Sequence, residues 1–383
     1  MGRLILPTAA GGTETVTLTA GPAPERGGDW TRIAYAAAHV VADPLADVSP
    51  WDEAAIDWDR TLAFRQHLFS LGFGVAEAMD TAQRGMGLGW DASIELIRRS
   101  VDAAPDGALI ACGAGTDHLA PGPDVTLDDV IAAYEMQCEA VEATGAPVIL
   151  MASRALAACA RGPEDYLKVY AKVLGGLSRP AILHWLGEMF DPALAGYWGA
   201  ADHMAAMETC LSVIEADADK VDGIKISLLS AEKEVAMRRR LPEGVRMYTG
   251  DDFNYPDLIA GDDEGHSDAL LGIFDPIAGA AARALTALSR GDTQTYRAAF
   301  EPTVPLSRHV FGPPTRFYKT GVVFLAYLQG HQDHFTMIGG QESARSTLHL
   351  AGIVRLAEEA RLFTDPEAAA ARARPVFAAR GVA

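Results

Sequence analysis

The chain has 383 residues, a length that suits one large domain with extensions or two domains. Its formal net charge of −19 at pH 7 makes nucleic acid and anionic membrane surfaces unfavourable partners, because like charges repel. Hydrophobic residues make up 49% and charged residues 22%, which is the composition of an ordinary globular protein of enzyme size.

The cysteines and the N-terminus predict a cytoplasmic protein. The N-terminal segment MGRLILPTAAGG has no signal-peptide hydrophobic region, and no apolar run approaches the ~20 residues of a membrane span. The four cysteines form no CxxC pair, so neither a disulfide framework nor a zinc motif is indicated, and we expect reduced thiols. They are Cys112, Cys138, Cys159 and Cys210.

In chain order, the first predicted element is a small β-hairpin over residues 1–20, followed by a loop to residue 30. Eight short apolar runs come next. Several are nearly continuous in apolar character rather than alternating, which is typical of strands covered on both faces. The runs span residues 32–41, 73–79, 107–112, 147–152, 180–185, 221–227, 245–249 and 268–274.

Amphipathic helical patterns separate these runs, and the link after the seventh run, residues 251–267, is the least regular. The helical patterns span residues 57–72, 91–104, 126–145, 163–177, 203–218, 230–241 and 276–291. Eight strands, each followed by a helix or a helix-like link, predict an α/β protein with a (β/α)8 TIM barrel. A doubly wound sheet is the alternative fold, but such a sheet would not use all eight predicted strands.

The pattern of strands stops near residue 290, and the rest of the chain reads as helices. The predicted helices span residues 292–311, 315–330, 342–362 and 365–381. The organisation that we expect is an N-terminal hairpin extension over residues 1–30, a barrel over residues 31–290 and a C-terminal helical region over residues 291–383.

Lys225 stands out because it lies inside an apolar strand, in the segment VDGIKISLL, residues 221–229. Burial without a partner lowers the pKa of a lysine, and a neutral amine attacks carbonyl carbons to form an imine. Barrel enzymes carry catalytic groups near the C-terminal ends of their strands, which is where Lys225 falls. The alternative is a lysine that snorkels to solvent or pairs with a carboxylate.

The segment GIKIS, residues 223–227, and the later segment GDDFNYPDLIAGD, residues 250–262, resemble the dihydrodipicolinate synthase/N-acetylneuraminate lyase superfamily of class I aldolases. The likeness covers about residues 32–360 and marks the chain as a divergent branch. It implies that Lys225 forms a covalent imine without any cofactor, that a small keto compound is the substrate, and that the chain forms a homo-oligomer, either a dimer or a tetramer.

The site differs from the family pattern at two places. Where the family has a GTTGE loop for a substrate carboxylate, this chain has MDTAQ, which aligns Asp80 and Thr81 with the two threonines. Where the family has a proton-relaying tyrosine, this chain has His184, whose ordinary pKa of ~6.5 suits proton transfer near neutrality. The structural alternatives are that Asp80 and Thr81 form a turn leading into a helix, and that His184 is a hydrogen-bonded residue of the core.

Carboxylates near the expected site favour a polyhydroxylated, sugar-derived substrate, because hydroxyl groups donate hydrogen bonds to them. Pyruvate-using relatives carry an arginine a few residues after the position of His184; this chain has none there, and Glu188 lies nearby instead. Asp251 and Asp252 follow the seventh strand, and their alternative role is to cap the next helix. Other polar residues at strand ends are expected to line the substrate cavity: His39, Asp43, Thr116, Asp117, Ser153 and Arg154, of which Arg154 is the best candidate for binding an anion.

A divalent metal is a weaker possibility in two places. His331 and His334 would share one face of a helix, with Asp333 or Glu342 as a third ligand. A second set at the barrel mouth combines His184, Glu188, Asp251 and His266. No GxGxxG, Walker or GxSxG motif is present.

Three functions remain open from the sequence. The first is a lyase of aldolase or dehydratase type in carbohydrate metabolism, with Lys225, His184 and Thr81 as catalytic residues. The second is a metal-dependent sugar isomerase or epimerase, and the third is a non-catalytic barrel that binds a small ligand. Substrate identity, the choice between aldol cleavage and dehydration, and the oligomeric state are left undetermined.

Overall fold

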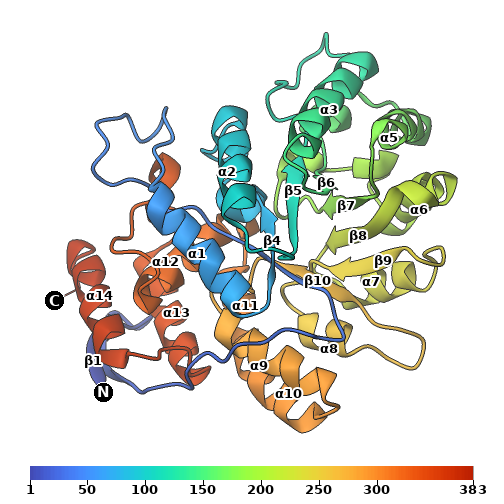
Figure 1. The fold of residues 1–383 in the computed structure, drawn as a ribbon. Helices are drawn as coiled ribbons and strands as arrows, with labels where there is room; N and C mark the ends of the chain where they lie inside the picture. Colours follow the sequence, from blue (N-terminus) through green and yellow to red (C-terminus); the bar gives the residue numbers. More distant parts are fainter. Residues whose placement is uncertain (383) are drawn as a thin grey trace.

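A computed structural model describes residues 1–382, and its centre is a closed barrel of eight parallel strands in the order β10-β3-β4-β5-β6-β7-β8-β9. The predicted (β/α)8 barrel is therefore confirmed (Figure 1). The strands are β3 (Ala34–Ala37), β4 (Gly74–Glu77), β5 (Ile110–Ala114), β6 (Val148–Leu150), β7 (Ala181–Leu186), β8 (Val221–Ser227), β9 (Arg246–Thr249) and β10 (Asp268–Leu271).

Helices surround the barrel, as the amphipathic patterns predict. They are α1 (Trp58–Ser70), α2 (Trp90–Ala103), α3 (Leu127–Glu142), α4 (Arg154–Cys159), α5 (Pro163–Gly176), α6 (His203–Ala216), α7 (Ala231–Arg238), α8 (Tyr255–Ala260) and α9 (Ala278–Ser289). Short 3-10 turns are η1 (Asp80–Ala82), η2 (Pro192–Leu194), η3 (Tyr197–Gly199), η4 (Ala218–Lys220), η5 (Glu301–Thr303), η6 (Thr315–Phe317) and η7 (Ile338–Ser343).

The C-terminal region is helical and packs beside the barrel (Figure 1). Its helices are α10 (Thr293–Phe300), α11 (Val304–Val310), α12 (Tyr318–Gln329), α13 (Thr347–Glu359) and α14 (Pro366–Ala379). The single helix expected over residues 292–311 is in fact two, α10 and α11, because Pro302 and Pro305 lack the N–H that a helix interior needs.

The helix expected to carry His331 and His334 on one face is also wrong. Helix α12 ends at Gln329, and Gly330 follows in the left-handed conformation with φ of 86°. Beyond it, the His331 ring packs against the His67 ring, with the ring centroids 4.5 Å apart.

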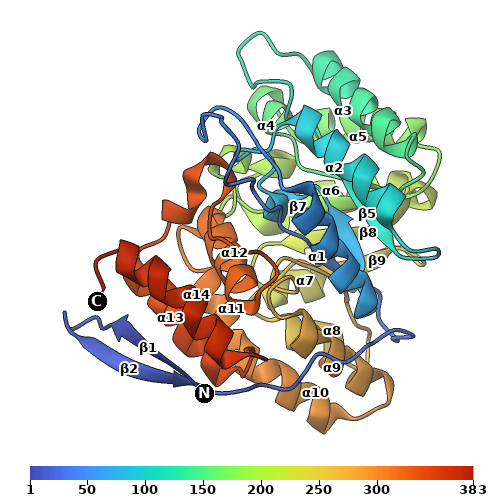
Figure 2. The ribbon, with the colours of Figure 1, turned by 60° about the vertical axis from the view of Figure 1, so that its left-hand side comes forward.

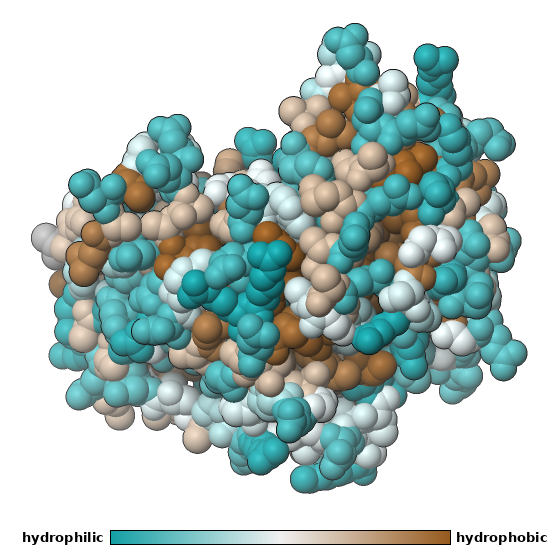
Figure 3. Space-filling view, turned by 45° about the horizontal axis from the view of Figure 1, so that its top comes forward, coloured by the Kyte–Doolittle hydropathy of each residue, from teal (hydrophilic) through white to brown (hydrophobic). Residues whose placement is uncertain are grey.

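The N-terminal hairpin is confirmed as β1 (Gly2–Pro7) paired antiparallel with β2 (Thr13–Leu18). It lies against α13 and α14, so the two ends of the chain pack together (Figure 2). Leu4, Leu6 and Leu18 are buried in this contact. Hydrophilic side chains cover most of the projecting parts of one face of the molecule, with hydrophobic ones visible mainly between them (Figure 3). Within residues 1–382, no helix has the length and apolar character that a membrane crossing requires.

Alternation along the strands decides which side chains point into the barrel. Ile182 and Tyr248 belong to the cluster of buried residues inside the barrel, whereas Ile224 and Ile226 belong to the outer core that packs against the helices. Since neighbours along a strand point to opposite faces, Lys225, which lies between Ile224 and Ile226, points inward. The periodicity of β8 therefore places the lysine inside the barrel.

Candidate active site

Lys225 lies at the C-terminal end of the barrel, paired in register with His184 on β7 and Tyr248 on β9. Only 6% of it is exposed, and it lines an inner cavity of about 10 Å³. Burial lowers the pKa of Lys225, while the charges of Asp80 and Asp252 oppose that shift. Within residues 1–382 the amine forms no hydrogen bond or ion pair, so it is free to meet a ligand.

Gly250 leaves room for this lysine. It directly follows β9, and a Cβ atom added there would lie 2.9 Å from Cε of Lys225. It would also press on Ser227, which lines the same inner cavity. The glycine of the GDD segment is therefore explained by close packing against the lysine.

A pair of hydroxyl groups forms another wall of the inner cavity. Thr81, in the turn η1 after β4, and Tyr318, the first residue of α12, lie with their hydroxyl oxygens 2.8 Å apart. The Tyr318 ring stacks on Phe311, with centroids 4.4 Å apart, and meets the edge of Phe190. Burial, reinforced by the charge of Asp80, raises the pKa of Tyr318 well above its usual value, so its hydroxyl is protonated at neutral pH.

Sequence reasoning missed Tyr318. It belongs to the C-terminal helical region, and nothing in the local segment RFYKT separates it from any other residue at a helix start. It reaches the barrel because α11 and α12 pack beside the strand ends, so that Tyr318 and Gly272 line the same cavity as Lys225. The helical region therefore contributes directly to the candidate active site.

His184 points into the barrel beside Lys225. Its Nε2 lies 3.4 Å from Oγ of Ser227, and its Nδ1 lies 3.9 Å from Oδ2 of Asp80 and has no hydrogen-bond partner. Burial, together with the charge of Lys225, lowers the pKa of His184 well below its usual value. The sequence-based expectation that His184 titrates near neutrality is therefore wrong, because in this environment the ring stays neutral.

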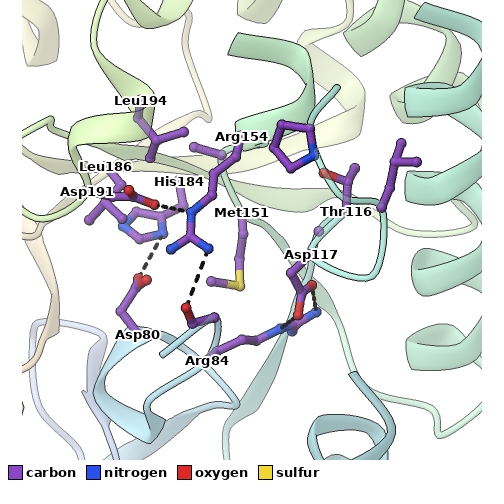
Figure 4. Close-up of a pocket in the computed structure, with 15 residues that line it drawn as sticks. Asp80, Arg84, Thr116, Asp117, Met151, Arg154, His184, Leu186, Asp191 and Leu194 are labelled. Atoms are coloured by element: carbon purple, nitrogen blue, oxygen red, sulfur yellow. Dashed lines mark hydrogen bonds and ion pairs between the residues drawn. The ribbon is translucent and has the colours of Figure 1, made fainter. Parts of the chain in front are cut away.

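Asp80 lines both the inner cavity and a neighbouring outer cavity of about 80 Å³. The outer cavity also contains His184, Thr116 and Arg154, as Figure 4 shows. Nε of Arg154 donates to Asp191, and only a long contact of 3.4 Å joins its Nη1 to the carbonyl oxygen of Gly85. Its remaining N–H groups are open to a ligand.

The other polar residues predicted to line the site have partners within the protein. The hydroxyls of Thr116 and Ser153 lie 2.6 Å apart, and Ser153 also accepts the N–H of Leu156 as the cap of α4. Asp117 forms an ion pair with Arg84 at 2.8 Å. Thr116 and Asp117 line the outer cavity, while Ser153 supports its wall.

Some predicted site residues line neither cavity. Glu188 forms an ion pair with His203 at 3.0 Å. Asp251 accepts the backbone N–H groups of Phe253 and Asn254 in the turn before α8, and it does not cap that helix, whose N-cap residue is Asn254. His39 binds Asp275. Asp43 bonds within its own loop, to the N–H of Leu45.

The four residues of the second metal set are also not brought together. His266 is half-buried and faces Arg32 and Arg238. Within residues 1–382, no group of three or more His, Cys, Asp or Glu side chains is placed to hold a metal ion. The proposed ligand sets around His184 and around His331 are therefore not assembled.

Two further carboxylic acids, one in the wall of the inner cavity and one on α7, have raised pKa values. Asp252 lines the inner cavity, and burial raises its pKa to about 7 although it accepts the N–H of Ile273. Burial likewise raises the pKa of Glu234, on α7, to about 8. The hydroxyls of Thr249 and Ser267 donate to Glu234 at 2.9 and 2.7 Å. Both acids therefore hold a proton at pH values where ordinary carboxyl groups are ionised.

Glu234 should make folding less stable as pH rises. Its pKa rises from 4.5 unfolded to about 8 folded, so the folded chain binds the proton more tightly, and this contribution to stability is lost progressively as pH rises from about 4.5 to about 8. Between pH 5 and pH 8, the free energy of unfolding of the wild type should therefore fall by roughly 2–4 kcal/mol because of Glu234. Glu234→Gln has no group to titrate at this position and should not show that part of the fall. Urea denaturation at both pH values measures this. Glu232→Gln, on the exposed side of α7, is the control, and equal pH dependence in all three proteins would contradict the prediction.

The comparisons place this geometry in a known fold. The chain is similar to the structure of YagE, a prophage protein of the dihydrodipicolinic acid synthase family from E. coli K12 in complex with pyruvate, with a TM-score of 0.66, 14% identity, and 87% of this chain and 99% of that one covered. For the dihydrodipicolinate synthases DapA-2 of Bacillus anthracis and of Aquifex aeolicus, the TM-scores are 0.63 and 0.60 and the identities 13% and 11%. The alignments cover 85% of this chain and 97% of the first, and 92% of this chain and 98% of the second.

These likenesses confirm the predicted resemblance at the level of the fold: the chain is a divergent barrel of the dihydrodipicolinate synthase type. It belongs to the family described as "Protein of unknown function (DUF993)", whose profile matches residues 4–382. A search of the curated proteins finds no match.

Proposed function

We propose that this protein is a lyase of class I aldolase type, which forms an imine between Lys225 and a small keto compound. The observation that carries the proposal is the amine of Lys225, buried at the C-terminal end of the barrel without a hydrogen-bond or ion-pair partner within residues 1–382. A lysine kept for structure would need a carboxylate or carbonyl partner at such a depth.

The reaction begins when the neutral amine attacks the carbonyl carbon. The carbonyl oxygen takes up a proton, and the carbinolamine then loses that oxygen as water to leave a protonated imine. The imine then acts as an electron sink. In the retro-aldol direction the β-hydroxyl group loses its proton, the Cα–Cβ bond cleaves to release a carbonyl compound, and the enamine left on Lys225 takes up a proton at the α carbon to become an imine again. In dehydration the α carbon loses a proton to give an enamine, and the β-hydroxyl group then takes up a proton and leaves as water. A second water molecule hydrolyses the imine and frees Lys225.

Proton transfer in these steps is assigned to the groups around the amine. The Tyr318 hydroxyl, bonded to Thr81, is protonated at neutral pH and can donate to the departing oxygen. His184 has a buried nitrogen without a hydrogen-bond partner and a lowered pKa, which suits a neutral ring that accepts a proton only briefly. Thr81 orients Tyr318 and the substrate carbonyl.

The substrate that we propose is a sugar-derived keto compound. Asp80 lines both cavities, and its carboxylate would repel a carboxylate on the carbon next to the carbonyl but accept hydrogen bonds from hydroxyl groups there. Arg154, in the outer cavity, is placed to bind an anionic group at the far end of the molecule.

Borohydride reduction with a panel of keto sugars and keto acids tests this function. An imine reduced in place leaves a stable mass increase on the protein, and peptide mapping should find it on Lys225. If no carbonyl compound in the panel labels the protein, the lyase proposal fails and a non-catalytic ligand-binding barrel is favoured. A metal-dependent isomerase would instead lose activity after chelation, although no metal-binding group is assembled within residues 1–382.

Arg154→Gln should separate acidic from neutral substrates. Removing a charge-assisted hydrogen bond should lower kcat/KM for a keto sugar acid by about 10- to 100-fold and leave a neutral keto sugar unaffected. Arg161→Gln is the control, because Arg161 is exposed just beyond α4. Steady-state kinetics on both substrate types measures the effect, and an equal loss on both would contradict this role for Arg154.

We also propose that the protein works in the cytoplasm as a homo-oligomer, a dimer or a tetramer. Cysteines that form no disulfide support the location. Analytical ultracentrifugation at several concentrations tests the assembly.

A further inference from the structure

Asp252 lines the same inner cavity as Lys225, and the proton transfers assigned to Tyr318 and His184 do not use it. It lies in the link after β9, and 4% of it is exposed. Its Oδ1 accepts the backbone N–H of Ile273 at 2.9 Å, and its backbone carbonyl oxygen accepts the hydroxyl of Ser307 on α11. The carboxyl group is therefore held from two sides at the wall of the cavity.

The carboxyl group of Asp252 and the amine of Lys225 are close but not in contact. Each charge shifts the pKa of the other group, yet no ion pair joins the two within residues 1–382. The cavity that both groups line has a volume of about 10 Å³, which is room for one oxygen atom with the size of a water molecule. This is the size of the oxygen that a carbonyl compound brings to the amine and that later leaves as water.

Tyr318 can donate a proton to this oxygen only if that proton is replaced at once. Burial raises the pKa of Tyr318 well above its usual value, so a phenolate is unfavourable there. His184 lines the outer cavity and not the inner one. Of the two carboxyl groups in the inner cavity, that of Asp252 is the more deeply buried, since the Asp80 side chain is 19% exposed. Asp252 is therefore the acid best shielded from exchange with bulk water.

The surroundings of Asp252 allow it both to hold and to release a proton near neutral pH. Burial raises its pKa to about 7, the charge of Lys225 on β8 opposes that shift, and the charge of the adjacent Asp251 adds to it. Two phenols also face Asp252, those of Tyr318 on α12 and Tyr255 on α8. A group whose pKa lies near the working pH is an effective proton carrier, because it gains and loses a proton with little free energy.

We propose that Asp252 is the catalytic acid–base of imine formation. It accepts a proton from the Lys225 ammonium, which leaves a neutral amine and a carboxylic acid. The amine adds to the carbonyl carbon, and its nitrogen gives a proton to the carbonyl oxygen, which forms a neutral carbinolamine. Asp252 then returns its proton to that hydroxyl group, directly or through Tyr318. The C–O bond breaks, water leaves, and the nitrogen lone pair forms the C=N bond. The products are a protonated imine and the Asp252 carboxylate.

Charge balance favours this assignment, which rests on the proposed lyase function. The protonated imine forms near the Asp252 carboxylate, where the Lys225 ammonium stood before the reaction, so the cavity gains and loses no net charge. A proton drawn from bulk water would instead leave a cation without a counter-charge at this depth. Hydrolysis of the imine uses the same steps in reverse.

The rate of imine formation, measured by rapid mixing with dihydroxyacetone and quenching with borohydride, tests the proposal. Asp252→Asn keeps an oxygen for the N–H of Ile273 and removes only the titratable group. It should slow imine formation by about 10²- to 10⁴-fold and still label Lys225 at long incubation. Asp257→Asn is the control, because Asp257 is exposed on α8 and lines neither active-site cavity, and it should react as the wild type does.

Chemical rescue separates proton transfer from a structural role, and it uses a second variant in case the first folds poorly. Asp252→Ala leaves space where the carboxyl group was. Formate should raise its rate of imine formation by about tenfold or more, whereas formamide, which has a similar shape but does not titrate, should not.

The outcomes distinguish this inference from the function on which it rests. Equal rates in the wild type and Asp252→Asn, an equal loss in the Asp257→Asn control, or an Asp252→Ala rate that formate leaves unchanged would overturn the role of Asp252 alone. Rescue by formamide as well as by formate would do the same. A wild type that neither dihydroxyacetone nor the rest of the carbonyl panel labels would overturn the lyase function and the role of Asp252 together.

Discussion

Replacing Lys225 with alanine should abolish turnover, by on the order of 10⁴-fold or more, because no other group can form the covalent imine. The same change should abolish borohydride labelling with any keto substrate. Circular dichroism and the unfolding midpoint should show that the barrel is intact, since the amine has no hydrogen-bond partner in the protein and its removal leaves no other polar group unpaired. Mass spectrometry with and without borohydride is the direct measurement.

The control for this experiment is a second lysine. Lys233, on α7, lies 2.8 Å from Nδ1 of His203 and lines neither active-site cavity, so Lys233→Ala should keep both activity and labelling. Lys319 is the competing amine, because burial lowers its pKa to about 8 and it follows Tyr318 directly. If the label in Lys225→Ala persists and maps to Lys319, the assignment of Lys225 is contradicted.

Tyr318→Phe should lower kcat by about 10²- to 10⁴-fold, the range that a positioned acid or base contributes. It removes one oxygen and leaves the stacking on Phe311 in place, so the fold should be unaffected. Because the amine of Lys225 is untouched, borohydride labelling at long incubation should persist. Stopped-flow measurement of imine formation, beside steady-state kcat and KM, separates proton transfer from substrate binding.

Tyr327→Phe is the matched control, since Tyr327 lies on the same helix and donates to the carbonyl oxygen of Arg372 at 2.9 Å, away from the barrel mouth. It should keep the wild-type kcat. Full turnover in Tyr318→Phe, or the same loss in both variants, would show that the hydroxyl pair with Thr81 has only a structural role.

The barrel could be predicted from the sequence because its signal is local. Each strand is a short, almost continuous apolar run, as in the run around Ile182. A helical pattern or a helix-like link separates each run from the next. The inward orientation of Lys225 follows from the same local rule of alternation between Ile224 and Ile226. Both features depend on residues that are neighbours in the chain.

The rest of the site depends on pairs that lie far apart in the chain. Thr81 and Tyr318 are 237 residues apart, and no periodic pattern connects them. Glu188 was expected at the site because of its position after β7, but in the folded chain it forms an ion pair with His203 instead. The pKa of His184 could not be predicted either, because burial beside Lys225 sets it and the sequence indicates only the residue type.

The position of Tyr318 at the start of α12 has a consequence for biosynthesis. A chain being made on the ribosome can close its eight-stranded barrel once β10 has emerged, but it then lacks a group that the proposed chemistry uses. Catalytic competence would come only when the last helices have been released and packed against the strand ends. An unfinished polypeptide would thus carry the amine of Lys225 without the proton donor that makes the proposed reaction fast.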